Sequence, residues 1–240
     1  MKERVMRWVF ALTACASIAA VILICVFLFA NGVPAMAEIG FFNFVGGQRW
    51  KPSSGLYGIW PMIVGSLYVT AGALIVGVPA GIFTAMYLAR FCNKRLYRFL
   101  KPAINLLAGI PSVVYGFFGL VVLVPLVREW LGGTGMSTLT ASVLLGIMIL
   151  PTIIGVAESA IRAVPEAYYE GALALGATHE RSVFFVVLRA ARSGVLAGVV
   201  LGIGRAIGET MAVIMVAGNQ PYIPSSILDG VRTMTTNIVL

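Results

Sequence analysis

The sequence predicts an all-α integral membrane protein, a bundle of about five transmembrane helices. Charged residues make up only 11% of its 240 residues, whereas soluble domains have about 25%. Hydrophobic residues make up 60%, and the mean hydropathy is +0.97. The apolar residues are gathered in runs of roughly 20 or more, the length that crosses a bilayer. These features exclude a soluble enzyme, a disordered chain and a secreted disulfide scaffold.

The first apolar run, residues 8–30, carries no charge and follows a basic N-terminus. A small-residue triplet at 35–37 resembles a signal-peptidase site, so a cleaved signal is the alternative to a retained membrane helix. A signal h-region covers about 7–15 residues, and this run is longer, so we expect a retained helix. Residues 31–59 are rich in Gly, Pro, Ser and aromatic residues, which predicts an outer loop at the membrane interface.

Four further apolar runs predict four more spans, and the basic residues orient them. The expected spans are residues 60–89, 102–127, 137–157 and 183–217. The N-terminus and the 90–101 loop hold eight Lys or Arg residues, and the loops on the other side hold four. The positive-inside rule therefore places the N-terminus and the polar loop 158–182 in the cytoplasm. The net charge of +8 then indicates orientation rather than nucleic-acid binding.

The span count leaves the C-terminus open. Five spans put Leu240 on the outer side, and residues 234–240 are too short to cross again. Either the C-terminus is external, or the sequence stops before a last helix. The hydropathy pattern does not separate these alternatives.

The cysteines and the histidine predict neither a disulfide nor a metal site. Cys15 and Cys25 lie on one apolar stretch, where ten residues of helix separate them by about 15 Å. Cys92 follows a span in a basic loop, and the single histidine, His179, has no metal-binding partner pattern. We expect His179 to be an exposed loop residue.

The 158–182 loop predicts a short helix over residues 165–178. Pro165 is placed to open it at its first position and Gly176 to close it. Glu166 and Glu170 lie near its start, where the helix dipole favours negative charge. Its apolar residues are Ala167, Ala172, Leu173, Ala174 and Leu175. Such a helix could be a solvated loop helix, or it could dock into a groove of a partner. We expect Glu158 and Arg162 to form a solvated pair at the loop entrance.

This loop resembles the cytoplasmic EAA loop of ABC-importer permeases. The resemblance rests on Glu170-Gly171-Ala172, then Gly176, then Val186-x-Leu188, and the departures are Gly171, Val186 and Arg189. In that family the loop forms the coupling helix seated on the ATP-hydrolysing subunit. The resemblance therefore implies a short cytoplasmic coupling helix here. The residues that it assigns to ATPase coupling are Glu166, Glu170, Gly171, Ala172, Leu175 and Gly176.

Two further stretches resemble permeases of the phosphate-specific transport system. They are residues 108–116 and residues 204–213, the latter with Glu209-Thr210-Met211-Ala212-Val213, which is closer to the PstC-type subunit than to the PstA-type partner. These stretches and the hydropathy pattern together cover most of the chain from the second span onward. PstC-type chains have six helices, with one more after a Met-Thr-Thr stretch such as 234–236. The resemblance thus favours a truncated C-terminus, and a division into a first helix with its outer loop (1–59) and a permease domain (60–240).

Arg205 and Glu209 are the candidate residues of a substrate path. They are four apart on an expected helix, so they share one face and can pair. An ionisable side chain at the bilayer centre costs about 2.5–3.5 kcal/mol and faces a bundle interior or an aqueous path. A structural ion pair that fixes helix register is the alternative. Arginine suits phosphate oxygens, and Glu209 is expected to mask Arg205 when the path is empty. Gly194, Gly198 and Gly202, and also Gly204 and Gly208, predict close helix packing nearby.

The resemblance implies a permease subunit of an ATP-driven importer for inorganic phosphate in the bacterial cytoplasmic membrane. It implies a second, homologous permease, an ATPase dimer that binds ATP and magnesium, and an extracytoplasmic phosphate-binding protein. The chain has no phosphate loop of its own, because none of its lysines stands in a Gly-Lys-Ser/Thr sequence. We therefore expect no catalysis and no cofactor in this chain. The alternatives are a permease for sulfate or molybdate, and a motor-independent anion channel or membrane scaffold.

Overall fold

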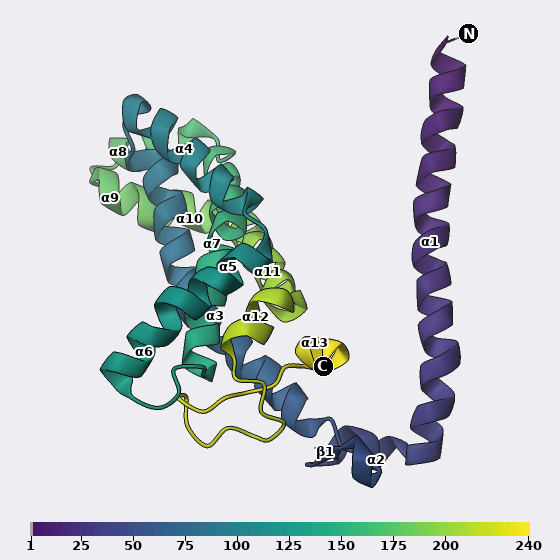
Figure 1. Ribbon diagram of the computed structural model, residues 1–240. Helices are drawn as coiled ribbons and strands as arrows, with labels where there is room; N and C mark the ends of the chain where they lie inside the picture. Colours follow the sequence, from purple (N-terminus) through teal and green to yellow (C-terminus); the bar gives the residue numbers. More distant parts are fainter. Residues whose placement is uncertain (1) are drawn as a thin grey trace. The chain divides into compact units, whose positions relative to one another are not determined.

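The computed structural model describes residues 2–240, and within them nearly all regular structure is helical (Figure 1). The chain forms two compact units, Met1–Trp60 and Pro61–Leu240. Four helical stretches of the described chain are long and apolar enough to cross a membrane, or five if a bent helix pair counts as one span. The all-α membrane fold with about five spans is thus confirmed.

The first unit is dominated by α1 (Lys2–Ile39), whose stretch Val5–Ile39 is long and apolar enough to cross a membrane. The prediction of an outer loop that starts at residue 31 is wrong for residues 31–39, which belong to α1. Helix α1 continues through Pro34, because Ala, Met and Glu residues after the proline are strong helix formers. The remaining elements of the unit are α2 (Phe41–Gly46), β1 (Trp50–Lys51), the 3₁₀ turn η1 (Pro52–Ser54) and β2 (Leu56–Tyr57).

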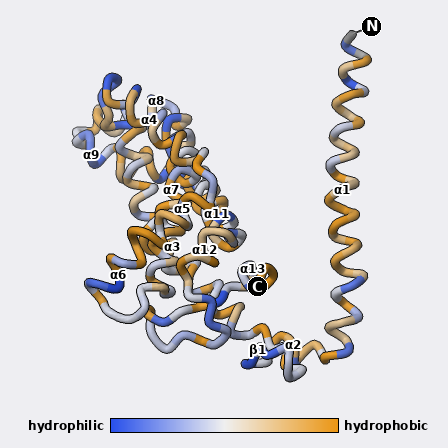
Figure 2. Tube along the Cα trace, viewed as in Figure 1, coloured by the Kyte–Doolittle hydropathy of each residue, from blue (hydrophilic) through white to orange (hydrophobic). Residues whose placement is uncertain are grey.

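The spans of the second unit come from three helical stretches and a bent pair. The three stretches are α3 (Trp60–Met86) with the π-helical turn η2 (Tyr87–Phe91); α5 (Ser112–Phe118), the π-helical turn η3 (Gly119–Leu123) and α6 (Val124–Leu131); and α7 (Thr138–Arg162). Figure 2 shows apolar residues along these helices and polar residues toward the end that carries α4, α8 and α9.

The third predicted span, residues 102–127, is wrong at its start. A separate helix, α4 (Lys94–Gly109), takes in most of the expected basic loop. The Asn93 side chain caps α4 by accepting a hydrogen bond from Leu96 N at 2.8 Å. Ile110 ends it in extended backbone, because the proline that follows disfavours the helical conformation. The span then runs over Ser112–Leu131.

The fourth span is longer than predicted. Helix α7 passes residue 157 and ends at Arg162, so the polar connection begins at Ala163. Glu158 and Arg162 therefore belong to a helix and not to a loop. The sequence between residue 157 and Pro165 contains no helix breaker, and this explains the extension.

The final apolar run, residues 183–217, is broken twice. Its elements are the π-helical turn η4 (Val183–Val187), α10 (Leu188–Ala190), α11 (Arg192–Gly208) and α12 (Met211–Val216). The helix axis turns by 71° between His179–Ala190 and Arg192–Gly208. The second break is at Glu209, whose backbone is extended. An irregular segment, residues 217–233, follows and leads to α13 (Met234–Val239).

Helix α11 packs on α7 through part of the expected glycine face. A Cβ atom on Gly194 would collide with Ala160 Cβ, and one on Gly202 would lie 2.9 Å from Ile153 Cγ1. These two glycines and Gly198 let the backbones approach closely, as predicted. A Cβ atom on Gly204 would meet nothing within 4 Å in the described chain, and Gly208 is alike. The prediction that these two glycines serve packing is therefore not supported within this chain.

Candidate functional site

The loop expected to couple the chain to a partner forms a short helix, α8 (Glu166–Ala174). Pro165 directly precedes α8 and is not its first residue as predicted, because its ψ of 137° lies outside the helical range. Gly176 closes the turn after α8 with a φ of +83°, a left-handed conformation that a side chain would strain. A short helix is therefore confirmed, but it ends at Ala174 and not at residue 178 as predicted, because the chain turns at the left-handed Gly176.

Helix α8 is attached to the end of α3 by Arg90. The Arg90 guanidinium donates to Glu166 Oε2 at 2.7 Å and to Val164 O at 3.5 Å. The guanidinium also lies 5.8 Å from the centre of the Tyr169 ring. The Arg90 side chain is 12% exposed, whereas that of Glu166 is 58% exposed. Glu166 thus holds the start of α8 in place while remaining accessible from outside.

His179, expected to be an exposed loop residue, is half-buried at the start of α9 (His179–Ser182). Its Nδ1 atom lies 2.8 Å from the Tyr169 hydroxyl, and its ring meets that of Phe91 edge to face at 4.6 Å. The histidine therefore packs the turn after α8 against the end of α3. This prediction is corrected, because the sequence did not indicate that α8 and α9 fold back on one another.

Apolar side chains on α8 and directly after it are exposed in the described chain. Leu175, at the end of the helix, is 91% exposed, Tyr168 is 55% exposed and Leu173 is 40% exposed. Of the other residues expected to take part in coupling, Glu170, Gly171 and Gly176 are exposed and Ala172 is half-buried. The predicted coupling residues therefore lie together on one short, accessible segment.

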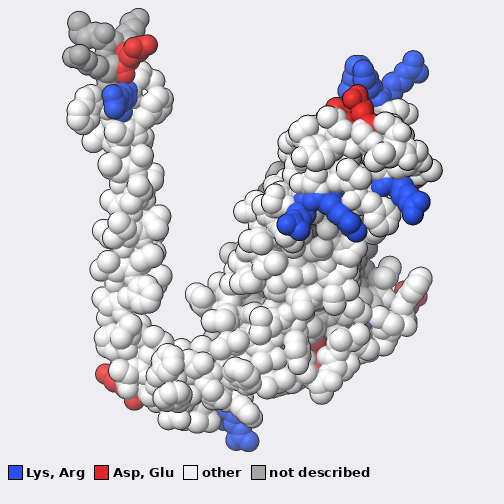
Figure 3. Space-filling view, turned by 180° about the vertical axis from the view of Figure 1, so that it is seen from behind, with Lys and Arg blue, Asp and Glu red and all other residues white. Residues whose placement is uncertain are grey.

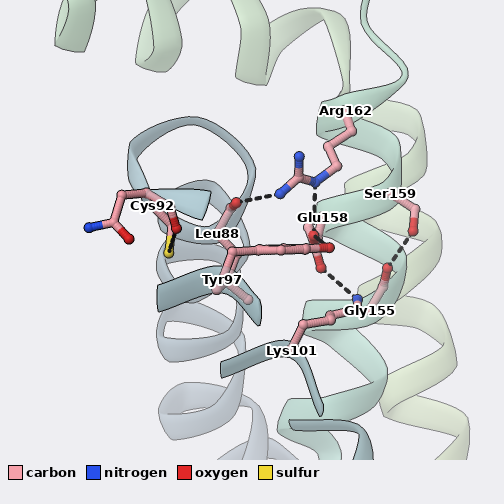
Figure 4. Close-up of polar contacts among 9 residues, drawn as sticks. Leu88, Cys92, Tyr97, Lys101, Gly155, Glu158, Ser159 and Arg162 are labelled. Carbon is pink, nitrogen blue, oxygen red and sulfur yellow. Dashed lines mark hydrogen bonds and ion pairs between the residues drawn. The ribbon is translucent and has the colours of Figure 1, made fainter. Parts of the chain in front are cut away.

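A buried carboxylate that was predicted to be solvated lies just before this segment (Figure 4). The Glu158 side chain is 1% exposed, and three groups donate hydrogen bonds to it. Tyr97 Oη donates to Oε1 at 2.8 Å, Lys101 Nζ to Oε2 at 2.6 Å, and Arg162 Nε to Oε1 at 2.9 Å. The hydrogen bond to Glu158 is the main cause of the raised pKa of Tyr97. Burial of a carboxylate is tolerated here because two cations and a hydroxyl satisfy it.

The Glu158 cluster joins three helices. Tyr97 and Lys101 belong to α4, and Glu158 and Arg162 to α7. Arg162 Nη2 also donates at 2.6 Å to the carbonyl of Leu88, in the π-helical turn that ends α3. The predicted pairing of Glu158 with Arg162 is thus confirmed at 2.9 Å, but its carboxylate is buried and not solvated as expected.

The predicted Arg205–Glu209 pair is not formed. Helix α11 ends at Gly208, and the extended backbone of Glu209 carries its side chain away from the face of Arg205. Arg205 Nη1 instead donates to Thr152 Oγ1 on α7 at 3.3 Å. Glu209 Oε1 accepts from Ala212 N at 3.1 Å. The ion pairs recorded among residues 2–240 are Arg90–Glu166, Lys101–Glu158 and Arg162–Glu158.

Arg205 and Glu209 are nevertheless both half-buried in the apolar part of the bundle. Glu209 borders a small internal pocket whose polar lining includes Ser66, Thr70 and Thr233. Its backbone carbonyl accepts a hydrogen bond from Thr235 Oγ1 at 2.9 Å. The two side chains therefore offer an unpaired guanidinium and a carboxylate among hydroxyl groups, separately and not as an ion pair.

Basic side chains mark the end of the second unit where α4, α8 and α9 lie (Figures 1 and 3). Lys94, Arg95 and Arg98 on α4 are exposed there, as is Arg181 on α9. Among residues 2–240, no group of three or more His, Cys, Asp or Glu side chains is arranged to hold a metal ion.

The sequence is similar to known transport proteins over most of its length. The family model for binding-protein-dependent transport system inner membrane components matches residues 77–239. A probable ABC transporter permease protein of Bacillus subtilis (strain 168), YqgH, is 40% identical over 95% of this chain and 76% of its own. The phosphate transport system permease protein PstC of Mesorhizobium japonicum is 34% identical, over 88% of this chain and 70% of its own.

An archaeal relative and a solved structure extend the similarity. A probable phosphate transport system permease protein PstC of Methanocaldococcus jannaschii is 32% identical over 83% of this chain and 69% of its own. A chain of the MetNI methionine ABC transporter, solved in inward-facing conformations, matches with a TM-score of 0.50 and 25% identity. That match covers 66% of this chain and 70% of the transporter chain.

Proposed function

The chain belongs to the family of binding-protein-dependent transport system inner membrane components, and on this premise we propose that it carries inorganic phosphate inward. It would act as one transmembrane permease subunit of an ATP-driven ABC importer, of the PstC type. Support for phosphate comes from relatives that are named phosphate transport permeases and are 32–36% identical. The two phosphate-permease stretches at residues 108–116 and 204–213 agree with this assignment.

The observation that carries the motor-driven part of the proposal is the accessible helix α8. It presents Leu175, which is 91% exposed, beside Gly171 and the left-handed Gly176. An exposed leucine directly after a short helix suits a groove of a partner protein. We infer that the partner is the ATP-hydrolysing subunit, present as a dimer that binds ATP and magnesium. A second, homologous permease and an extracytoplasmic phosphate-binding protein complete the importer, and this chain catalyses no reaction.

The substrate path proposed here passes Arg205 and Glu209. Thr152 gives Arg205 a neutral partner, so the positive charge is not cancelled by a carboxylate at hydrogen-bond distance. A guanidinium has five donors in a planar fork and stays charged, which suits the oxygens of phosphate. Its charge also acts more strongly in a protein interior than in water. Glu209 is available to accept a hydrogen bond from the hydroxyl group of protonated phosphate. Sulfate has no such donor at neutral pH.

Uptake by reconstituted importer tests the substrate. The chain is assembled with its ATPase, second permease and binding protein in liposomes, and labelled phosphate is added outside with ATP inside. We expect ATP-dependent uptake that excess unlabelled phosphate suppresses and excess sulfate or molybdate does not. Suppression by sulfate or molybdate instead would assign the importer to another oxyanion. An Arg205→Gln variant is expected to lose uptake while the complex still assembles.

Leu175→Glu separates a motor-driven permease from a channel. A buried, unpaired carboxylate at the contact with the ATPase costs several kcal/mol, so the ATPase should no longer copurify and uptake should stop. Leu131→Glu, at an exposed leucine that ends α6, serves as the matched control and is expected to keep the ATPase bound. Anion movement that persists in Leu175→Glu without ATP would support a motor-independent channel.

The proposed location is the bacterial cytoplasmic membrane with α8 and the N-terminus inside. The exposed basic residues of α4 and α9 lie at the same end of the second unit as α8. Positive residues concentrate on the cytoplasmic side of membrane proteins, so α8 would meet a cytoplasmic ATPase.

A further inference from the structure

The Glu158 cluster lies where the membrane-spanning helices meet the segment that leads to α8. Helix α7 ends at Arg162, only four residues after Glu158, and α8 begins at Glu166. A displacement of α8 therefore reaches α7 first. Whether it also reaches α3 and α4 depends on what joins these helices at the same level.

Three hydrogen bonds from two arginines join the end of α3 to the end of α7 and the connection to α8. Arg162 donates to the Leu88 carbonyl at 2.6 Å, and Arg90 donates to Glu166 at 2.7 Å and to Val164 O at 3.5 Å. The last carbonyls of a helix lack partners within it, and a cation beside them is favourable. Arg162 and Arg90 thus hold the end of α3 from both sides of the connection.

Glu158 adds α4 to this assembly and also orients Arg162. Its two oxygens accept hydrogen bonds from Tyr97 and Lys101 of α4 and from Arg162 of its own helix. The Arg162 guanidinium also lies 4.5 Å from the centre of the Tyr97 ring. One carboxylate therefore fixes the side chains that hold both α4 and α3 to α7. Because it is 1% exposed, water cannot replace these contacts without opening the cluster.

We propose that Glu158 is a positioning residue that makes the cytoplasmic ends of α3, α4 and α7 move with α8 as one rigid block. Movement of α8 is then passed to three helices together instead of bending the single connection at Ala163–Pro165. This inference rests on the proposed function insofar as the ATPase moves α8. It assigns a role in energy coupling to a residue outside both the substrate path and the docking surface.

The first experiment measures rigidity directly and does not depend on the transported substrate. Spin labels are placed at Phe99 on α4 and at Ala163 after α7, both exposed, with the three native cysteines replaced by serine. In the complete importer, the distance between the labels should be the same without nucleotide and with ATP trapped. In Glu158→Gln the distribution of distances should broaden and its mean should change with nucleotide, because Lys101 loses its charged partner. Ser159→Ala, at an exposed neighbour whose hydroxyl bonds its own helix at Gly155 O, should behave as wild type.

The second experiment measures substrate taken up per ATP hydrolysed in liposomes. A purely structural role would lower uptake and hydrolysis together, because both report the amount of folded complex. A positioning role predicts that hydrolysis continues in Glu158→Gln while uptake per ATP falls about 5-fold or more, the lower end of common coupling strengths. If Glu158→Gln does not assemble, the Lys101→Met variant tests the positioning role instead. It removes only the α4 cation, leaves Glu158 paired with Arg162, and should lower the same ratio.

The outcomes separate this inference from the proposed function. Wild-type protein that fails to take up phosphate would contradict the proposed substrate, and the spin-label distances would still decide the rigid block. A distance that changes with nucleotide in the wild type, or equal distance distributions in wild type and Glu158→Gln, would overturn the inference. Unchanged uptake per ATP in both Glu158→Gln and Lys101→Met would do the same.

Discussion

At the scale of single residues, Glu209 holds the break between α11 and α12. Its carboxylate accepts from Ala212 N at 3.1 Å, one of the amides at the start of α12 that lack a partner within the helix. We expect Glu209→Ala to lower the free energy of unfolding by about 1 kcal/mol, as the loss of a helix cap does. Glu209→Gln keeps an acceptor oxygen and should cost less. Thermal unfolding in detergent measures both, with Glu129→Ala on the exposed end of α6 as a control.

The same variants test the role of the Glu209 charge in transport. If the carboxylate accepts a hydrogen bond from protonated phosphate, Glu209→Gln should lower uptake and weaken the preference for phosphate over sulfate. Unchanged uptake together with an unchanged preference would leave Glu209 with the capping role only.

Asp229 organises the irregular segment before α13. Its Oδ2 atom accepts hydrogen bonds from the Ser225 hydroxyl at 2.8 Å and from Ser226 N at 2.8 Å. These hydrogen bonds lower the pKa of Asp229, and the bond from the Ser225 hydroxyl has the largest effect. Because the pKa is lower in the folded state, the ionised carboxylate stabilises the segment at pH values above the unfolded-state pKa of about 3.9. This stabilisation is lost as the pH falls through the folded-state pKa.

We therefore expect the Ser226 amide to stay protected from hydrogen exchange from neutral pH down to about pH 4 and to lose protection below it. In Asp229→Asn the acceptor is neutral, so protection should be weaker at neutral pH and should not change in that acid range. Equal protection in the two proteins at neutral pH would contradict this assignment.

The residue types of the site could be predicted from the sequence, but their partners could not. Arg205 and Glu209 were correctly expected in an apolar helical region, and their predicted pairing failed because α11 ends at Gly208. Glu158 was expected in solvent, and it is buried because α4 covers it with Tyr97 and Lys101. The spacing of residues along one helix does not indicate which other helix will pack there.

At the scale of elements, the contact between α11 and α7 depends on glycine. A Cβ atom on Gly194 would collide with Ala160, so Gly194→Val should cost about 1–3 kcal/mol through overpacking. Gly204→Ala, on the same helix with nothing within 4 Å of an added Cβ, is the matched control and should be neutral or stabilising by up to about 1 kcal/mol. Unfolding in detergent gives both values. Equal loss of stability in the two variants would contradict a specific packing role for Gly194.

The number of spans could be predicted from hydropathy, but their breaks could not. Hydropathy averages over a window, so it found apolar runs near α3, α7 and α11 correctly. It joined α4 to the following span, because Pro102 and the apolar residues after it fit a membrane helix as well as an amphipathic one. The bend at Ala191 involves neither glycine nor proline. It arises where the segment after α9 turns to let α11 pack along α7, which is a tertiary effect.

At the scale of the whole molecule, the arrangement of helices in the second unit indicates which residues face each side of the membrane. Helix α7 has 25 residues and is thus about 37 Å long, enough to cross a hydrocarbon core of roughly 30 Å. Trp130, near the end of α6 just before α7, and Leu175, after α8, are 77% and 91% exposed. They should therefore lie on opposite sides.

Single-cysteine variants measure this sidedness in intact cells of a cysteine-free background. Trp130→Cys should react with a membrane-impermeant maleimide from outside. Under the proposed orientation, with the exposed basic residues of α4 and α9 in the cytoplasm, Leu175→Cys should react only after the membrane is permeabilised. When the ATPase is produced in the same cells, it should protect Leu175→Cys after permeabilisation as well, and leave Trp130→Cys unaffected. Labelling of Leu175→Cys from outside would invert the orientation, and α8 could then not reach a cytoplasmic motor.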